Sequence, residues 1–180
     1  MKQTQRWIIT GEIGAGKTLF CMEIVELARQ AGLSLGGLIS PGVFEDGRKV
    51  GINVVDLKGQ QTCRLANPRK EGVSGPSTKG WSFVEGSVAW GNRVLAQAVP
   101  CDILIIDELG PLEFERGEGW VKGLTILDEG DFEVGLVVIR PHLLDQALER
   151  WPDAQTIEIS PASDIPHLVK EVLHRFGVED

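Results

Sequence analysis

The stretch Gly11-Glu12-Ile13-Gly14-Ala15-Gly16-Lys17-Thr18 decides the fold of this chain. It follows an apolar run, residues 7–10, and precedes a segment with helical periodicity. Glycines let backbone N–H groups turn inward around an anion, and the next helix points the positive end of its dipole at the same place. These eight residues therefore predict a nucleotide-phosphate site of the Walker A type, in which Lys17 reaches the β and γ phosphates and Thr18 ligates Mg²⁺.

A second stretch, Ile103-Leu104-Ile105-Ile106-Asp107-Glu108, is apolar and ends in two acids. Such a run is typical of a central parallel strand that is buried on both faces. Ligands of open α/β sheets bind at the carboxyl ends of the strands. We therefore predict that Asp107 binds nucleotide and Mg²⁺ beside Thr18, and that Glu108 polarises a water molecule that attacks the γ-phosphate.

The adjacent Asp-Glu pair also separates classes of nucleotide enzyme. Transfer of phosphate to an acceptor requires that water be excluded, whereas hydrolysis requires that water be oriented. Glu108 therefore favours hydrolysis. Specificity for guanine through an Asn-Lys-x-Asp or Thr-Lys-x-Asp signature is unsupported, because Thr78-Lys79-Gly80-Trp81 lacks the aspartate.

Length and composition agree with one folded domain. The chain has 180 residues, of which 42% are hydrophobic, enough for a single core over residues 1–180. Its three cysteines are widely spaced and form no Cys-x-x-Cys pair, which indicates reduced thiols in the cytoplasm. The sequence shows neither a signal peptide nor an apolar run long enough to cross a membrane.

The charge is unevenly distributed. The formal net charge is −8, which disfavours a nucleic-acid partner. The segment from Arg48 to Arg93, however, contains eight basic and three acidic residues, so its formal charge is +5. A basic insert in an acidic chain suits a lid over a triphosphate, and a solvated basic face is the alternative.

The hydrophobic pattern alternates between strands and helices, with one interruption. Antiparallel β-meander is predicted for residues 41–66, where short alternating runs are joined by polar turns, and a mobile loop for 67–80. A charged loop is expected at 109–118. We predict strands at 6–10, 34–40, 103–108, 134–139 and 156–159, and helices at 17–31, 85–99, 120–127 and 142–149. A last helix, capped by Ser163 with its neighbour Asp164, is expected to run to about Phe176. Five parallel strands with right-handed crossovers give an α/β domain of three layers.

The order of the strands narrows the fold. The acid-ended strand is the third of the five, after a strand without Asp. This order is typical of the P-loop NTPase division that inserts an additional strand between the two motif strands and uses a catalytic Glu after the metal aspartate. Arg140 then falls at the tip of the fourth strand, where it either stabilises charge on the γ-phosphate or forms a surface pair with Glu133 or Asp145.

Three stretches make the chain resemble a known family, the small P-loop nucleoside-triphosphatases, which include hyperthermophile enzymes and the human cancer-related nucleoside-triphosphatase. The most distinctive stretch is Gly37-Leu38-Ile39-Ser40-Pro41, followed by Gly47-Arg48-Lys49-Val50-Gly51-Ile52 and Val54-Val55-Asp56-Leu57. The other two are residues 11–18 and the run Ile105-Ile106-Asp107-Glu108-Leu109-Gly110-Pro111-Leu112-Glu113.

The resemblance implies slow, Mg²⁺-dependent hydrolysis of several nucleoside triphosphates to diphosphates. It assigns Lys17 and Thr18 to phosphate and metal, Asp107 to the metal and Glu108 to water activation. Arg48 matches a meander position of undefined role, and Glu113 matches the acid that ends the family's Asp-Glu-x-Gly-x-x-Glu run, with a solvated loop charge as the alternative.

The basic-Gly-aromatic pattern after the loop departs from the family, since it appears as Lys79-Gly80-Trp81, without arginine or tyrosine. Trp81 is a candidate to stack on a base.

Two rival functions stay open at this stage. A nucleoside or nucleotide kinase would need an acceptor pocket and mobile arginines, for which Arg64, Arg69 and Arg93 are available. A slow nucleotide-dependent switch would act on a protein partner and would use the loop at 67–80 as its moving part.

Overall fold

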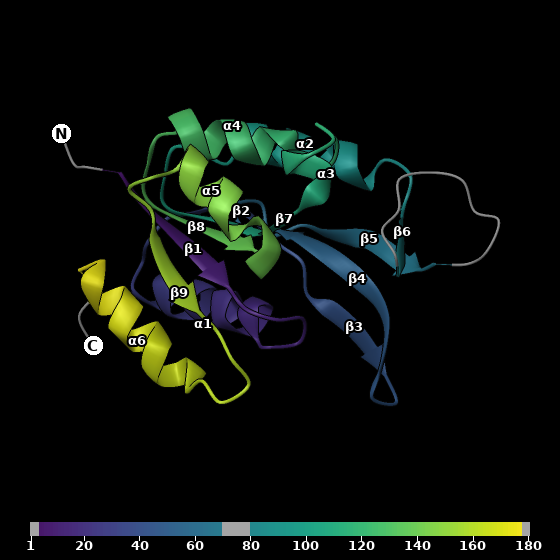
Figure 1. Ribbon diagram of the computed structural model, residues 1–180, viewed down its shortest axis with the longest axis horizontal. Helices are drawn as coiled ribbons and strands as arrows, with labels where there is room; N and C mark the ends of the chain where they lie inside the picture. Colours follow the sequence, from purple (N-terminus) through teal and green to yellow (C-terminus); the bar gives the residue numbers. More distant parts are fainter. Residues whose placement is uncertain (1–3, 70–79, 178–180) are drawn as a thin grey trace.

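A computed structural model describes residues 4–69 and 80–177 of the chain. In this part of the chain the strands form one sheet in the order β6-β5-β4-β2-β7-β8-β1-β9, with β3 paired to β4 (Figure 1). The strands are β1 (Gln5–Thr10), β2 (Leu35–Ile39), β3 (Gly42–Glu45), β4 (Arg48–Asp56), β5 (Thr62–Pro68), β6 (Trp81–Phe83), β7 (Cys101–Leu109), β8 (Phe132–Ile139) and β9 (Gln155–Glu158).

Helices cover both faces of this sheet and complete three layers (Figure 1). One face is covered by α1 (Lys17–Gln30) and α6 (Ile165–Arg175), and the other by α2 (Ser87–Ala96), α3 (Pro111–Phe114), α4 (Val121–Glu129), the 3₁₀ turn η1 (Pro141–Leu143) and α5 (Leu144–Arg150). None of the helices in the described residues has the length and apolar character needed to span a membrane.

The five parallel strands lie side by side in the order β2-β7-β8-β1-β9. The phosphate-loop strand β1 and the acid-ended strand β7 are not neighbours, because β8 pairs with both of them. The additional-strand arrangement predicted from the strand order is therefore confirmed. It places the ends of β1, β7 and β8 at one edge of the sheet, where a ligand can contact all three.

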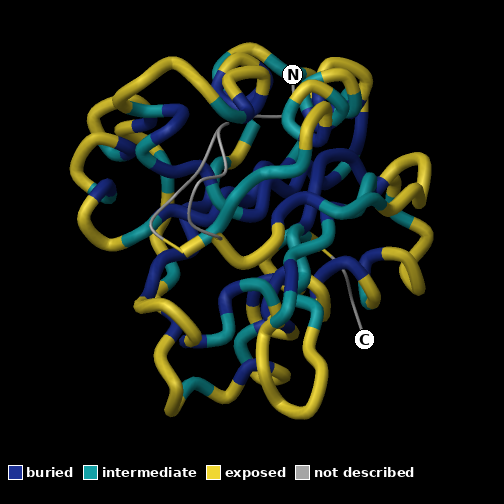
Figure 2. Tube along the Cα trace, turned by 90° about the vertical axis from the view of Figure 1, so that its right-hand side faces the viewer, coloured by how far each residue is buried: buried dark blue, intermediate teal, exposed yellow. Residues whose placement is uncertain are grey.

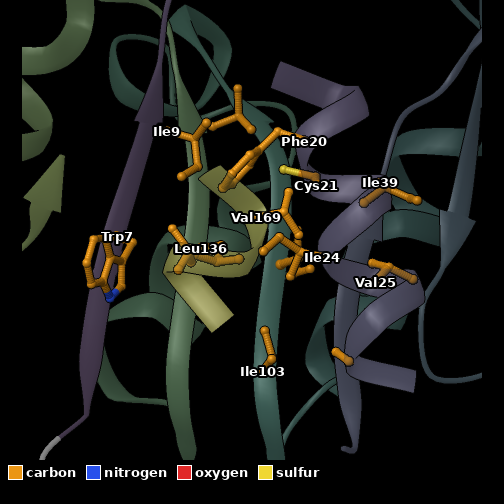
Figure 3. Packing of buried hydrophobic residues seen from close by; sticks show 14 of the residues in the cluster. Trp7, Ile9, Phe20, Cys21, Ile24, Val25, Ile39, Ile103, Leu136 and Val169 are labelled. Carbon is orange, nitrogen blue, oxygen red and sulfur yellow. The ribbon is translucent and has the colours of Figure 1, made fainter. Parts of the chain in front are cut away.

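The core explains why these strands are almost continuously apolar. Every residue of β2 is buried, and so is every residue of β7 except Asp102 and Glu108. On one face, Trp7, Ile103 and Leu136 belong to the same buried cluster as Phe20 and Ile24 of α1 (Figure 3). Figure 2 shows the buried trace running through the middle of the molecule, with exposed segments around it. The core thus holds the strand ends in fixed positions.

The predicted β-meander is present and extends the main sheet, since β4 pairs with β2 in antiparallel register through Leu38 and Asp56. The predicted loop at 67–80 needs correction at its start. Asn67 and Pro68 belong to β5, because β6 returns after the loop and pairs with them. Residues 70–79, including Lys79, lie outside the described residues.

The charged segment 109–118 is also more ordered than a loop. It contains the short helix α3, which begins with Pro111 at its first position and has Glu113 as the acid of a capping box. Proline at the start and an acid three residues after the cap are helix-start signals. The prediction of an irregular loop overlooked them.

Candidate active site

The phosphate loop adopts a conformation that requires glycine at two points. Gly11 has φ +143°, and a Cβ there would overlap the carbonyl oxygen of Ile159. Gly16 has φ +105° and stands as the N-cap of α1, with no side-chain capping bond. The first N–H groups of α1 are therefore available to an anion at the positive end of the helix dipole.

Lys17 is held across the opening of this loop. Its side chain is buried, and Nζ donates hydrogen bonds to the carbonyl oxygens of Gly11 at 2.5 Å and Glu12 at 2.7 Å. Burial lowers the pKa of the Lys17 ammonium group below its ordinary value, and the carboxylate of Glu108 opposes this effect. The loop thus positions a cation where the sequence places the terminal phosphates.

Asp107 links three elements of the site. Its Oδ1 accepts a hydrogen bond from Thr18 Oγ1 of α1 at 3.3 Å, and its Oδ2 accepts one from the backbone N–H of Ser40 after β2 at 3.0 Å. Asp107 is only 3% exposed. Burial raises the pKa of its carboxyl group, while the bonds from Ser40 and Thr18 act in the opposite direction.

The same residues fit a magnesium ion. Mg²⁺ prefers oxygen ligands and is held in nucleotide sites by one or two protein groups together with phosphate oxygens and water. Thr18 Oγ1 and Asp107 provide such oxygens, and the buried Ser40 Oγ beside them lacks a hydrogen-bond partner among the described residues. No group of three or more His, Cys, Asp or Glu residues suited to a metal occurs in residues 4–69 and 80–177. Thr18 and Asp107 would hold such an ion together with phosphate oxygens and water.

Sequence reasoning missed Ser40. A polar residue directly after the buried strand β2, next to the acid-ended strand, was the signal for it.

Glu108 leaves the regular strand geometry. The β7–β8 register shifts between Ile106 and Leu109, and Glu108 has φ +77°, a left-handed conformation that is rare outside glycine. Its carboxylate forms an ion pair with the Arg140 guanidinium group, which follows β8. The bulge therefore places the predicted water-activating acid beside the predicted charge-stabilising arginine.

Glu113 is not a solvated loop charge, so that alternative is wrong. It is 8% exposed, and its two carboxylate oxygens accept hydrogen bonds from the backbone N–H groups of Gly110 at 2.8 Å and Trp120 at 2.7 Å. A Cβ on Gly119 would overlap this carboxylate. Burial raises the pKa of Glu113, and the two N–H donors oppose the rise. Glu113 therefore ties Gly110 to Trp120 and holds residues 110–120 in place.

A cavity of about 360 Å³ gathers several of these residues. Thr18, Asp107, Glu108 and Arg140 line one part of it, and Trp81 lines another. Among the described residues that line this cavity, Arg48 does not occur. It is exposed and pairs with Glu45 in the β3–β4 ladder.

A glycine-rich loop between a parallel strand and a helix, with a buried aspartate on a strand two places away, defines a P-loop nucleotide-binding protein of the additional-strand type. Comparison with known families agrees. The model of the NTPase family matches residues 6–163, and the chain belongs to this family.

Relatives and a solved structure support the assignment. The chain is 31% identical over 109 residues to a nucleoside-triphosphatase THEP1 of Methanopyrus kandleri, with 60% of this chain and 59% of that relative covered. It is 30% identical to the THEP1 of Methanosarcina barkeri, with 81% and 83% covered. A human cancer-related nucleoside triphosphatase has the same fold, with a TM-score of 0.71, 18% identity, and 96% and 97% of the two chains covered. The chain thus spans about three fifths of the length of the first of these relatives.

Proposed function

We propose that this chain hydrolyses nucleoside 5′-triphosphates, including ATP and GTP, to nucleoside diphosphates and phosphate, with Mg²⁺ as cofactor. One observation carries the proposal. Asp107 is bonded to Thr18 at the start of α1, while the next residue, Glu108, lines the same cavity. A metal-binding pair and a carboxylate beside it are the groups that water attack on a terminal phosphate requires.

The roles of the chain's own residues follow from their positions. The N–H groups of residues 11–18 and the Lys17 ammonium group bind the β and γ phosphates. Thr18 and Asp107 hold the metal, which when bound neutralises charge on the phosphate oxygens. Glu108 orients a water molecule and accepts its proton as the new bond to phosphorus forms.

Arg140 has two roles in this proposal. It is paired with Glu108 in the structure, and an incoming γ-phosphate gives its guanidinium group a second anion to bind. Charge that develops on the γ-phosphate is then stabilised by a cation already in place. Movement of Arg140 toward the phosphate also releases Glu108 to contact water.

The remaining predictions are consistent with this function. The missing guanine signature supports broad tolerance of the base, and the single sheet supports one domain over residues 1–180. The free thiols of Cys21, Cys63 and Cys101 are compatible with a cytoplasmic location. Arg48, Lys79 and Trp81 stay candidates for contacts with substrate, and a protein partner stays open.

The test is steady-state release of phosphate from ATP, GTP, CTP and UTP with Mg²⁺, with the Glu108→Gln variant as the blank. Release that depends on Glu108 from several triphosphates is the expected result. Nucleotide binding without release from any of them would contradict the proposal. Comparison of partner binding with ATP and with ADP distinguishes a nucleotide-dependent switch.

A further inference from the structure

The cavity at Glu108 is larger than hydrolysis requires. Its volume of about 360 Å³ falls within the range of small-molecule sites, about 300–1,000 Å³, whereas a single water has a share of about 30 Å³ in the liquid. Away from Glu108 its walls are mainly apolar and aromatic, and are formed by Ile52, Leu65, Trp81, Phe83, Val88 and Trp120. Activation of a water molecule by Glu108 does not require these apolar and aromatic walls.

The nucleoside of the triphosphate is an unsuitable occupant. Among residues 11–18, all of which are described, only Thr18 lines the cavity. The cavity therefore adjoins the phosphate site at the metal and γ-phosphate end, next to Asp107 and Glu108. In a triphosphate bound to the loop, the γ-phosphate lies next to the cavity and the nucleoside lies at the opposite end of the phosphate chain. The cavity is therefore available to a second molecule.

The aromatic wall indicates what that molecule is. Trp81 and Phe83 are two residues apart in β6, so their side chains project from the same face of the strand. The Lys49 ammonium group lies 5.2 Å from the centre of the Trp81 ring and helps to fix its position. Two such rings at one wall suit a planar base, which can stack on aromatic side chains whatever its identity.

The other end of the cavity selects the reacting group. Glu108 is a carboxylate, which can accept a hydrogen bond and a proton from a hydroxyl group. We propose that this cavity binds a nucleoside as phosphoryl acceptor, with its base against Trp81 and Phe83 and a sugar hydroxyl at Glu108.

The reaction uses the groups of the proposed hydrolysis, on which this inference rests. The hydroxyl oxygen of the acceptor forms a bond to the terminal phosphorus, and the bond from that phosphorus to the bridging oxygen of the nucleoside diphosphate breaks. The hydroxyl proton passes to Glu108. The bound acceptor takes the place of water, so hydrolysis is the reaction of the same site when the cavity holds only water.

The experiment supplies ATP labelled in its γ-phosphate, Mg²⁺, and adenosine, guanosine, cytidine, uridine or thymidine in turn. Labelled nucleoside monophosphate, with less free phosphate per ATP consumed, is the expected result. If every nucleoside leaves all label in free phosphate while release still depends on Glu108, the acceptor site is wrong and the proposed hydrolysis stands. If label is transferred to an added nucleoside but ATP alone releases no phosphate, the acceptor site is supported and the proposed hydrolysis is overturned. If label is neither released nor transferred, both proposals fail.

Two substitutions locate the acceptor. Val88→Trp narrows the cavity from α2, and Ala89→Trp adds the same side chain at the exposed neighbouring position. The ratio of transferred to free phosphate should fall about tenfold or more in the first variant and stay unchanged in the second. Trp81→Ala removes a half-buried ring of β6 on which the base is proposed to stack, so it should raise the KM for the nucleoside about tenfold. An unchanged ratio in folded Val88→Trp, or an unchanged KM in Trp81→Ala, would overturn the placement.

Discussion

Arg140 and Glu108 form an ion pair between the ends of neighbouring parallel strands, through Arg140 Nε and Glu108 Oε1. The contact exists because Glu108 adopts a left-handed conformation within the bulge of β7. Both side chains are 37% exposed, so the pair faces the cavity and is open to exchange with a ligand. The structure thus couples the candidate water-activating acid directly to a cation.

Replacement of Glu108 by Gln should separate chemistry from binding. The amide keeps the size of the side chain but accepts no proton, so we expect turnover to fall by on the order of 10² or more while nucleotide affinity changes little. Phosphate release and calorimetric titration with a non-hydrolysable triphosphate measure the two effects. Hydrolysis at the wild-type rate would show that another group activates the water.

Replacement of Arg140 by Ala should lower kcat by about 10- to 10³-fold, because a preformed charge at the γ-phosphate is lost. The double variant with Glu108→Gln distinguishes cooperation from independent action. Since the two side chains contact each other, their effects on ln kcat should be clearly non-additive. Additive losses would mean that the ion pair has no part in turnover.

Replacement of Lys17 by Ala should weaken triphosphate binding about 10- to 100-fold, since charge-assisted hydrogen bonds to the phosphates are removed. The matched control is Lys122→Ala on the exposed surface of α4, which should bind normally. Fluorescence titration with ATP gives both dissociation constants. Equal affinity in the two variants would place the phosphates elsewhere.

Replacement of Asp107 by Asn should raise the Mg²⁺ concentration needed for half-maximal turnover about 10- to 100-fold, because the amide is a weaker ligand than a carboxylate. Removal of Mg²⁺ by a chelator should abolish turnover of the wild-type protein, and added Mg²⁺ should restore it. Activity that survives chelation would exclude Asp107 and Thr18 as metal ligands in the reaction.

Replacement of Glu113 by Ala should act on stability. It leaves the N–H groups of Gly110 and Trp120 without their acceptor, so the free energy of unfolding should fall by about 2 kcal/mol or more. The exposed Glu115→Ala is the control, and urea unfolding followed by tryptophan fluorescence measures both. Equal stability of the two variants would show that this carboxylate does not hold residues 110–120.

Much of the fold could be predicted because its signals are local. The glycines of residues 11–18, the apolar run before Asp107 and the order of the five parallel strands each follow from short stretches of sequence. The order also predicted that one strand separates β1 from β7, because β2, which has no terminal acid, comes before the acid-ended strand β7 in the chain. In the structure β8 is that separating strand.

The features that sequence reasoning missed depend on distant contacts. Pairing with β6 across the loop extends β5, and the burial of Glu113 depends on its bond to Trp120, seven residues away. The left-handed Glu108 was equally hidden, since a bulge arises from the pairing of β7 with β8. The strand pairings form only when the sheet assembles, so no local pattern encodes them, whereas the helix-start signals at Pro111 and Glu113 were present in the sequence.

The strand β8 sets the distance between β1 and β7. Because β1 and β7 both pair with β8, the backbones of β1 and β7 are separated by two strand spacings, or about 10 Å, and Thr18 at the start of α1 contacts Asp107 across this distance. The strand β8, which Arg140 follows in sequence, therefore works as a spacer, and changes in its packing would alter how Thr18 approaches Asp107.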